Sequence, residues 1–395
     1  MIRDETRKYL IFTSSEEGVD RRTSLLISDL TQVRHLQATN PKDKIYGLYA
    51  VFTALGISFP APDYGKTLEN IFEEACVAMI RHSGTLQMLE YASSNARAPD
   101  LPSWVADWQD KEVTLANPPT HATEGSRISQ ENLSTLSPTS GQLQVRGVMV
   151  GLITTRAKND FATLDFPSGS FPILNQETYQ LVNGEVDMLR MLVHRMQLFR
   201  EWMYLVDALP PIYSGEDSAH FFHQILTFKS DSSDARLFNA WVNIIQYPNT
   251  EYDLSSSKSL ADAWKSADNV IGCGWNTELY HCSVIAATLL ASATGHDRFP
   301  PEVAELLEFT QRLMANMSNR ALIQVHDPVL KATLPGTAFH TAKMNDSVFL
   351  LEGADYAVVL RPRGDQWSFV GPAYIVGIMD GEAWLEEKIQ ELVLV

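Results

Sequence analysis

The sequence predicts an α+β protein in which a mainly helical layer packs on a small antiparallel β-sheet or barrel. Two observations support this fold class. Before residue 320, most apolar residues recur at the three- and four-residue spacing of amphipathic helices. A central segment, 143–156, and the C-terminal stretches after residue 346 instead have the alternation and β-branched composition of strands. We therefore expect the central strand region and the C-terminal strands to form one sheet.

Length and composition predict a globular protein with more than one substructure. The chain has 395 residues, of which 45% are hydrophobic and 10% aromatic, enough to bury a large core. Residues 113–142 are rich in Ser, Thr, Asn and Pro and have weak apolar periodicity, which is typical of a surface linker. The predicted organisation is a helical N-terminal region, 1–112, this linker, and an α+β domain, 143–395.

The charge balance disfavours two classes of partner. The formal net charge is −17, from 48 acidic and 31 basic residues, and no Lys/Arg block could neutralise a row of phosphates. We expect no nucleic acid and no membrane as partner. The charged start, Met1 to Glu5, is not a secretory signal, and 283–293 is too short to cross a bilayer. Three scattered cysteines suit a reducing compartment, so a cytoplasmic location is expected.

Amphipathic helices dominate the first region. Apolar residues recur at helical spacing from 25 to 55, where Asn40 and Pro41 should begin a helix that ends at Gly56, and a second helix should begin at Leu68, capped by Thr67. Cys76 lies on the apolar stripe of that helix, so a core thiol is favoured over a nucleophile. Further helices are predicted at 185–209, 220–228, 237–246, 283–293 and 302–317.

The segment "LPSWVADWQD" has two interpretations. Trp104 and Trp108 are four residues apart, so a helical turn would place both indoles on one face, with Asp107 beside the second. In the first interpretation the indoles fill the core and Asp107 caps a backbone turn. In the second they line a substrate pocket that contains an acid.

The strand signals follow the linker and return near the C-terminus. In "LQVRGVMVGLITTR" the glycines Gly147 and Gly151 allow bends. The later predicted strands are "SVFLLEG", "YAVVLRP" and "WSFVGPAYIVGIM", with the turn "RGDQ" before the last.

The common cofactor and metal signatures are missing. The sequence has no Gly-rich phosphate loop, dinucleotide fingerprint or nucleophile elbow, so we expect no cofactor. His220 and His223 are three residues apart on a predicted helix, and His281 adjoins Cys282. This set lacks complete metal-ligand spacing, so no metal site is predicted.

Several segments together resemble fungal heterokaryon incompatibility (HET) proteins. These are "ATNPKDKIYGLYAV", "PDYGKTLENIFEEA", "LPSWVADW", "LQVRGVMVGLI" and the closing "DSVFLLEGADYAVVLRP…WSFVGPAYIVGIMDGEA", in the order of that family. The resemblance runs from about Leu25 to Leu385. It implies a fungal source and a shared ancestor.

The chain departs from this family in two places. It starts after the N-terminal region that, in the family, is thought to trigger cell death. Where the family tends to be glycine-rich before the last sheet, this chain has His326, Asp327, His340 and Lys343. The resemblance therefore implies a retained scaffold without its effector part.

The stretch "GPAYIVGIMDGEAW", 371–384, supplies the main catalytic candidates. If the strand ends near Met379, Asp380 and Gly381 form the turn and Glu382 opens a short helix. Tyr374 would share a strand face with Val376 and Ile378. In the catalytic interpretation Tyr374 is a proton donor, and Asp380 or Glu382 is a base whose pKa is raised by burial.

His340 and Lys343 are the other acid/base candidates, and folding could bring them near Trp104, Asp107 and Tyr374. The first functional hypothesis is a cofactor-independent enzyme that acts on an apolar fungal secondary metabolite by dehydration, isomerisation, cyclisation or cycloaddition. The alternative is a non-catalytic regulatory or interaction protein of the incompatibility type. Under either hypothesis, homo-oligomerisation or a protein partner stays open.

Overall fold

The computed structural model describes residues 34, 36–93, 98–110, 120–136, 141–161, 198–209, 218–228, 234–246, 301–329 and 331–395. The α+β class is confirmed, with helices and a seven-stranded, mostly antiparallel sheet. The chain divides into two compact units. Unit 1 comprises the residues up to 156 together with 323–395, and unit 2 comprises 157–322. The N-terminal helices thus share a unit with the strands, whereas the helices of 157–322 form a unit of their own.

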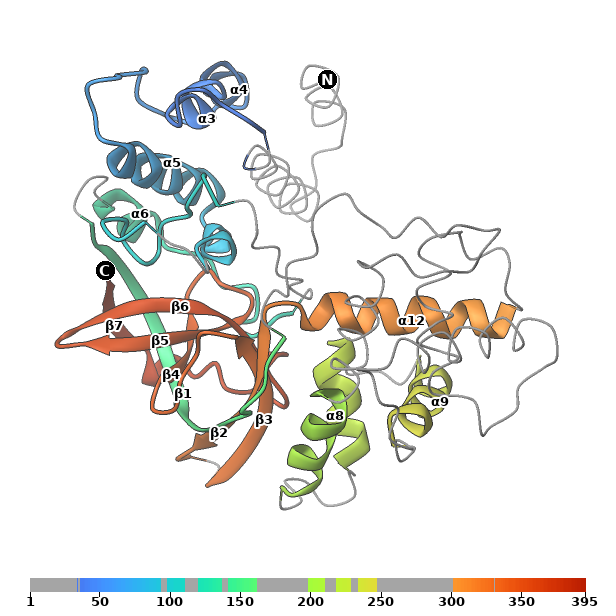
Figure 1. Cartoon of the computed structure of the whole chain (residues 1–395). Helices are drawn as coiled ribbons and strands as arrows, with labels where there is room; N and C mark the ends of the chain where they lie inside the picture. The colour runs from blue at the N-terminus through green and yellow to red at the C-terminus, as the bar shows by residue number, and fades with distance from the viewer. Residues whose placement is uncertain are drawn as a thin grey trace, which may run out of the picture. The chain divides into compact units, whose positions relative to one another are not determined.

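The strands form a closed ring of hydrogen-bonded neighbours. They are β1 (Leu143–Arg156), β2 (Arg320–Asp327), β3 (Ala332–Phe339), β4 (Ser347–Leu351), β5 (Ala357–Arg363), β6 (Gln366–Ile375) and β7 (Gln390–Leu394). Their order is β2-β3-β6-β5-β4-β1-β7, and a further pairing of β2 with β1 closes the ring. Figure 1 shows the long strand β1, in green, among the orange and red C-terminal strands.

Closure depends on the length and bends of β1. One edge of this 14-residue strand pairs with β4, while the other pairs first with β7, from Leu143, and later with β2, up to Arg156. The register of the β1–β4 pair shifts between Met149 and Gly151. A Cβ on Gly151 would lie 2.0 Å from the carbonyl oxygen of His326, so only glycine allows this approach. The bends predicted at the β1 glycines coincide with the place where β1 changes neighbours.

Sequence patterns did not reveal β2, β3 and β7. The last six residues of β3 are all buried, so this strand lacks the alternation that marks a half-buried strand. Gly336 of β3 lies so close to β6 that an added Cβ would be 2.3 Å from the carbonyl oxygen of Tyr374. β7 is short and begins with polar residues. Tertiary pairing, rather than local pattern, makes these segments strands.

Short helices of unit 1 precede the sheet. They are α3 (Asp43–Tyr46), α4 (Tyr49–Ala54), α5 (Leu68–Ser83), the 3-10 helix η2 (Gln87–Tyr91) and α6 (Gln130–Thr135). The Thr67 cap is confirmed, because its side chain accepts a hydrogen bond of 3.3 Å from the Asn70 amide. Gly56, with φ of 73°, follows the end of α4. Between Pro41 and Gly56, the chain forms two short helices rather than the one predicted, separated at Gly47 and Leu48.

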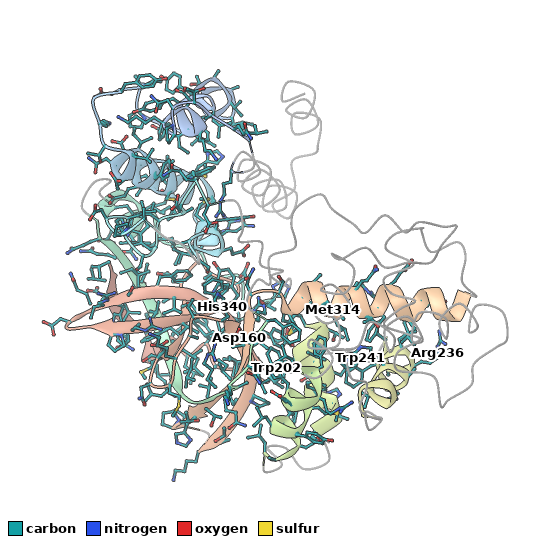
Figure 2. All side chains as sticks on the ribbon, viewed as in Figure 1. Asp160, Trp202, Arg236, Trp241, Met314 and His340 are labelled. Atoms are coloured by element: carbon teal, nitrogen blue, oxygen red, sulfur yellow. The ribbon has the colours of Figure 1, made fainter. Side chains whose placement is uncertain are left out.

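Unit 2 is built around aromatic side chains on helices. Residues 198–207 are helical, as are α8 (Ser218–Thr227), α9 (Ala235–Gln246) and α12 (Pro301–Met317). These match four predicted helices, and the one predicted at 283–293 lies outside the described residues. The ring of Phe161 is 4.9 Å from Trp202, and the ring of Phe199 is 4.9 Å from Trp241 (Figure 2). In the described part of the chain, no helix has the length and apolarity needed to span a membrane.

Candidate functional site

The two predicted pocket indoles are completely enclosed. Trp104 and Trp108 both have 0% exposure and lie in turns rather than in a helix. The Trp104 Nε1 donates a hydrogen bond of 3.3 Å to the Gly141 carbonyl oxygen. Asp107, also buried, accepts a hydrogen bond of 2.9 Å from the Gln109 amide. This geometry fits the packing interpretation, in which the indoles fill the core and the carboxylate caps a turn.

A buried arginine that sequence reasoning missed supports this turn. The Arg34 Nε donates to the Asp110 carbonyl oxygen at 2.9 Å, and its Nη1 donates to the Tyr91 carbonyl oxygen at 3.4 Å. Burial lowers the pKa of Arg34, while attraction to Asp110 and Asp107 opposes this shift. Arg34 therefore joins the end of η2 to the tryptophan turn.

Tyr374 is a buried phenol beside two carboxylates. It lies on β6 directly opposite Thr337 of β3, and 5% of it is exposed. Burial raises the pKa of Tyr374 well above its ordinary value, and the charges of Asp380 and Glu382 raise it further. The phenol therefore stays protonated at any physiological pH. The charges of Asp380 and Glu382 thus act on the Tyr374 phenol, while the catalytic roles of the three residues stay a prediction.

The backbone after Tyr374 differs from the predicted extended strand. β6 ends at Ile375 rather than near Met379, because the chain turns through Gly377 with φ of 85°. Val376 and Ile378 lie beyond the end of β6, so the prediction that they share a strand face with Tyr374 is wrong.

The carboxylates that follow this turn are both exposed. Glu382 lies in a turn instead of opening a helix, and its Oε2 accepts a hydrogen bond of 2.9 Å from the Asp380 amide. Gly381, with φ of 96°, lies in this turn, which is the second one after β6 and follows the turn at Gly377. The Glu382 carboxylate is thus held against the Asp380 backbone at the surface.

A segment from the predicted linker completes the polar surroundings of this turn. The His121 amide donates to the Met379 carbonyl oxygen at 2.9 Å, and the Ala122 amide donates to the Asp355 carbonyl oxygen at 3.2 Å. A Cβ on Gly381 would lie 2.6 Å from the Glu124 side chain. The side chains of the strand-end cluster, as we name it, are therefore Tyr374, Asp380, Glu382, His121, Glu124 and Asp355.

Asp355 contributes a perturbed carboxyl group to the strand-end cluster. Although the residue is exposed, the protein atoms around its carboxyl group raise its pKa by desolvation, and the charges of His121 and Arg127 oppose this effect. Sequence reasoning missed His121, Glu124 and Asp355. They carry no local motif, and the first two come from a segment rich in turn-forming residues.

His340 and Lys343 lie in the turn between β3 and β4. His340 is half-buried with its ring 4.7 Å from that of Phe339, and its carbonyl oxygen accepts a hydrogen bond of 2.6 Å from Arg156 Nη2 (Figure 2). The Lys343 amide donates to Asp346 Oδ2 at 2.7 Å, while the Lys343 side chain is exposed. The observed contacts place both residues in an arginine-supported turn, and their catalytic role stays a prediction.

Only two of the three histidines considered for metal binding lie among the residues that the structure describes. His220 and His223 lie on α8, where His220 Nε2 is 3.2 Å from Gln224 Nε2 and the His223 ring packs 4.8 Å from Phe238. His281 and Cys282 lie outside the described residues. Within the described ranges, no group of three His, Cys, Asp or Glu side chains is arranged to hold a metal ion.

Comparisons with protein-family models, curated proteins and solved structures find no match. The sequence segments from which a HET resemblance is inferred are distributed unevenly over the structure. All of them, from "ATNPKDKIYGLYAV" to "WSFVGPAYIVGIMDGEA", belong to unit 1, and none belongs to unit 2. The strand-end cluster also lies in unit 1.

Proposed function

We propose that the chain is a cytoplasmic, cofactor-independent enzyme that performs acid–base chemistry on an apolar fungal secondary metabolite. The observation that carries this proposal is the buried Tyr374 phenol with the carboxylates of Asp380 and Glu382 acting on it electrostatically. A buried phenol beside a carboxylate provides a hydrogen-bond donor and a base at one site. The retained scaffold implied by the HET resemblance would supply the support for that site.

The arrangement suits a reaction next to a carbonyl group. Asp380 or Glu382 would remove the proton α to the carbonyl, the electron pair of that C–H bond would form the C=C bond of an enolate, and the π electrons of the carbonyl would move to its oxygen. Tyr374 would donate a hydrogen bond to the resulting enolate oxygen. Collapse of the enolate would expel a β-hydroxyl group, which would take the proton back from the carboxylic acid and leave as water. The same groups could instead return the proton to another carbon, which would be an isomerisation.

The proposal is tested by gene deletion and complementation with matched variants. The deletion strain should lose one product and accumulate a hydroxylated or uncyclised precursor, as measured by mass spectrometry of culture extracts. Wild type and Tyr356→Phe should restore the product, whereas Tyr374→Phe should not. Tyr356 is a suitable control because it is equally buried and its hydroxyl donates to the Leu86 carbonyl oxygen at 3.3 Å, while the carboxylates that act on it are those of Glu90 and Asp355 rather than Asp380 and Glu382. Equal restoration by both variants would contradict a catalytic role for Tyr374.

A second candidate function is a non-catalytic regulator of the incompatibility type. The complete enclosure of Trp104 and Trp108 favours it, because indoles that line a substrate pocket are partly exposed when the pocket is empty. Unchanged metabolites in the deletion strain, together with altered fusion between strains, would favour this regulator over the enzyme.

A further inference from the structure

Four large apolar side chains are exposed on neighbouring segments of unit 1. Their exposed fractions are 38% for Met149, 41% for Leu152, 60% for Val329 and 60% for Met344. Met149 and Leu152 belong to β1, Val329 follows β2, and Met344 lies in the turn before β4. We name this set the apolar patch. It is separate from the strand-end cluster.

Backbone pairing brings these segments together. Leu152 is the register partner of His326 on β2, and both side chains are exposed, so they share the outer face. The Asn345 amide donates to the Ile153 carbonyl oxygen at 2.8 Å, which places the turn containing Met344 beside β1.

The exposure of Met149 and Leu152 and the position of Val329 also have structural causes. The register shift between Met149 and Gly151 changes the alternation of β1, which leaves both Met149 and Leu152 exposed. The Val329 amide donates to Asp327 Oδ1 at 2.7 Å, which fixes the turn directly after β2. The four apolar side chains are therefore held by regular pairing and by defined turns.

The charges of the three segments are positive at the surface, unlike those of the whole chain. Lys331 and Lys343 are exposed at their ends. The acidic residues of 148–154, 326–331 and 341–346 are Asp327 and Asp346, and both are buried. Asp346 accepts hydrogen bonds from Arg361 and Asp327 accepts one from a backbone amide, so their charges are directed inward. The apolar patch, flanked by two lysines, therefore differs in its surface charge from the chain as a whole, which has a net charge of −17.

We infer that the apolar patch is a docking surface for an acidic amphipathic segment of a partner protein. The exposed methionines, leucine and valine would contact the apolar face of that segment, and methionine adapts well to varied apolar partners. Lys331 and Lys343 would pair with its carboxylates and would speed association. Two exposed lysines can pair with the few carboxylates of a short acidic segment, whereas the extended anionic surface of a membrane would also face the acidic remainder of a chain with a net charge of −17.

Synthetic peptides test this inference on the full chain. Three fluorescent 14-residue probes share one helical pattern: one has a leucine face and glutamates, one has the same face and lysines, and one has serine in place of leucine and keeps the glutamates. Fluorescence anisotropy should show the Leu/Glu probe binding at least about tenfold more tightly than the others. Met344→Asp and Leu152→Asp should each weaken that binding by about tenfold or more. Lys343→Glu should weaken it less and reduce its dependence on salt.

A matched variant tests whether peptide binding is specific to the apolar patch. Two further measurements test the other possible partners, a membrane and a second copy of the chain. Leu36 is exposed to 53% at another place in unit 1, so Leu36→Asp should leave peptide binding unchanged. Equal loss with Leu36→Asp and Met344→Asp, or equal binding of the three probes, overturns the inference. Binding to phosphatidylcholine/phosphatidylserine vesicles that Met344→Asp abolishes would assign the apolar patch to a membrane. A dimer in light scattering that Leu152→Asp converts to a monomer would assign it to a second copy.

Discussion

Arg361 holds Asp346 through two hydrogen bonds of 2.8 Å, one from Nε to Oδ1 and one from Nη2 to Oδ2. The Asp346 side chain is 4% exposed and that of Arg361 is 32% exposed, so the pair is partly shielded from water. The Arg361 Nη2 also donates to the Thr341 carbonyl oxygen at 3.0 Å. The pair thus fastens the turn that contains His340 and Lys343 to β5.

Replacing Arg361 with methionine should destabilise unit 1 by about 2 kcal/mol, because it leaves the buried Asp346 carboxylate without its charged partner. Urea denaturation followed by circular dichroism measures this loss. The exposed pair Arg236–Glu305, with side-chain exposures of 71% and 52%, offers a matched control in unit 2. Arg236→Met should change stability by less than about 0.5 kcal/mol. Similar effects of the two substitutions would contradict the shielding argument.

Gly151→Ala should disturb closure of the strand ring. Its Cβ would lie 2.0 Å from the carbonyl oxygen of His326, and backbone on a paired strand cannot yield cheaply. We expect a loss of about 3 kcal/mol in the free energy of unfolding, or failure to accumulate folded protein. Gly65→Ala is the control, since its Cβ would meet only side-chain atoms of Asp63, with Oδ1 nearest at 3.1 Å. It should cost less than about 1 kcal/mol. A Gly151→Ala protein as stable as Gly65→Ala would show that β1 and β2 are not so closely paired.

Tyr374 should ionise only when the protein unfolds. Burial raises its pKa, so the folded state holds the phenol proton more tightly than the unfolded state does. The stability from this group is therefore fully present below the ordinary tyrosine pKa of about 10, and is lost as pH rises from there toward the higher pKa of the folded state. In an ultraviolet titration at 295 nm, Tyr374→Phe should remove one of the phenols that titrate only with unfolding. If it removes one that titrates near pH 10 in the folded protein, the phenol is not buried as described.

Thr67→Ala should destabilise α5 by about 1 kcal/mol, because the Asn70 amide loses its side-chain acceptor. Thr67→Ser keeps the hydroxyl and should keep most of the stability. Hydrogen exchange measures the effect locally, with faster exchange in the first turn of α5 in Thr67→Ala than in Thr67→Ser. Equal exchange in both variants would mean that the cap contributes nothing.

Part of the candidate site could be predicted from one stretch of sequence. Tyr374, Asp380 and Glu382 lie within nine consecutive residues, so any chain reversal between them keeps them close. His121 and Asp355 could not be assigned in this way, because backbone hydrogen bonds from 121–122 to residues 379 and 355 join distant parts of the chain. His340 and Lys343 show the opposite case. Their residue types suggested acid–base chemistry, but the observed contacts of their turn are those of a structural support.

The sequence by itself determined the α+β class, the cap and apolar stripe of α5, the bends of β1, and the strands β4, β5 and β6. Each of these follows from short-range physics: periodicity of burial, side-chain capping or glycine flexibility. Tertiary structure alone decided that β2, β3 and β7 are strands and that β1 closes the ring. It also decided that the paired indoles are sealed in the core. These outcomes depend on which distant segment supplies the hydrogen bonds and covers the apolar surface, and no local window of residues contains that information.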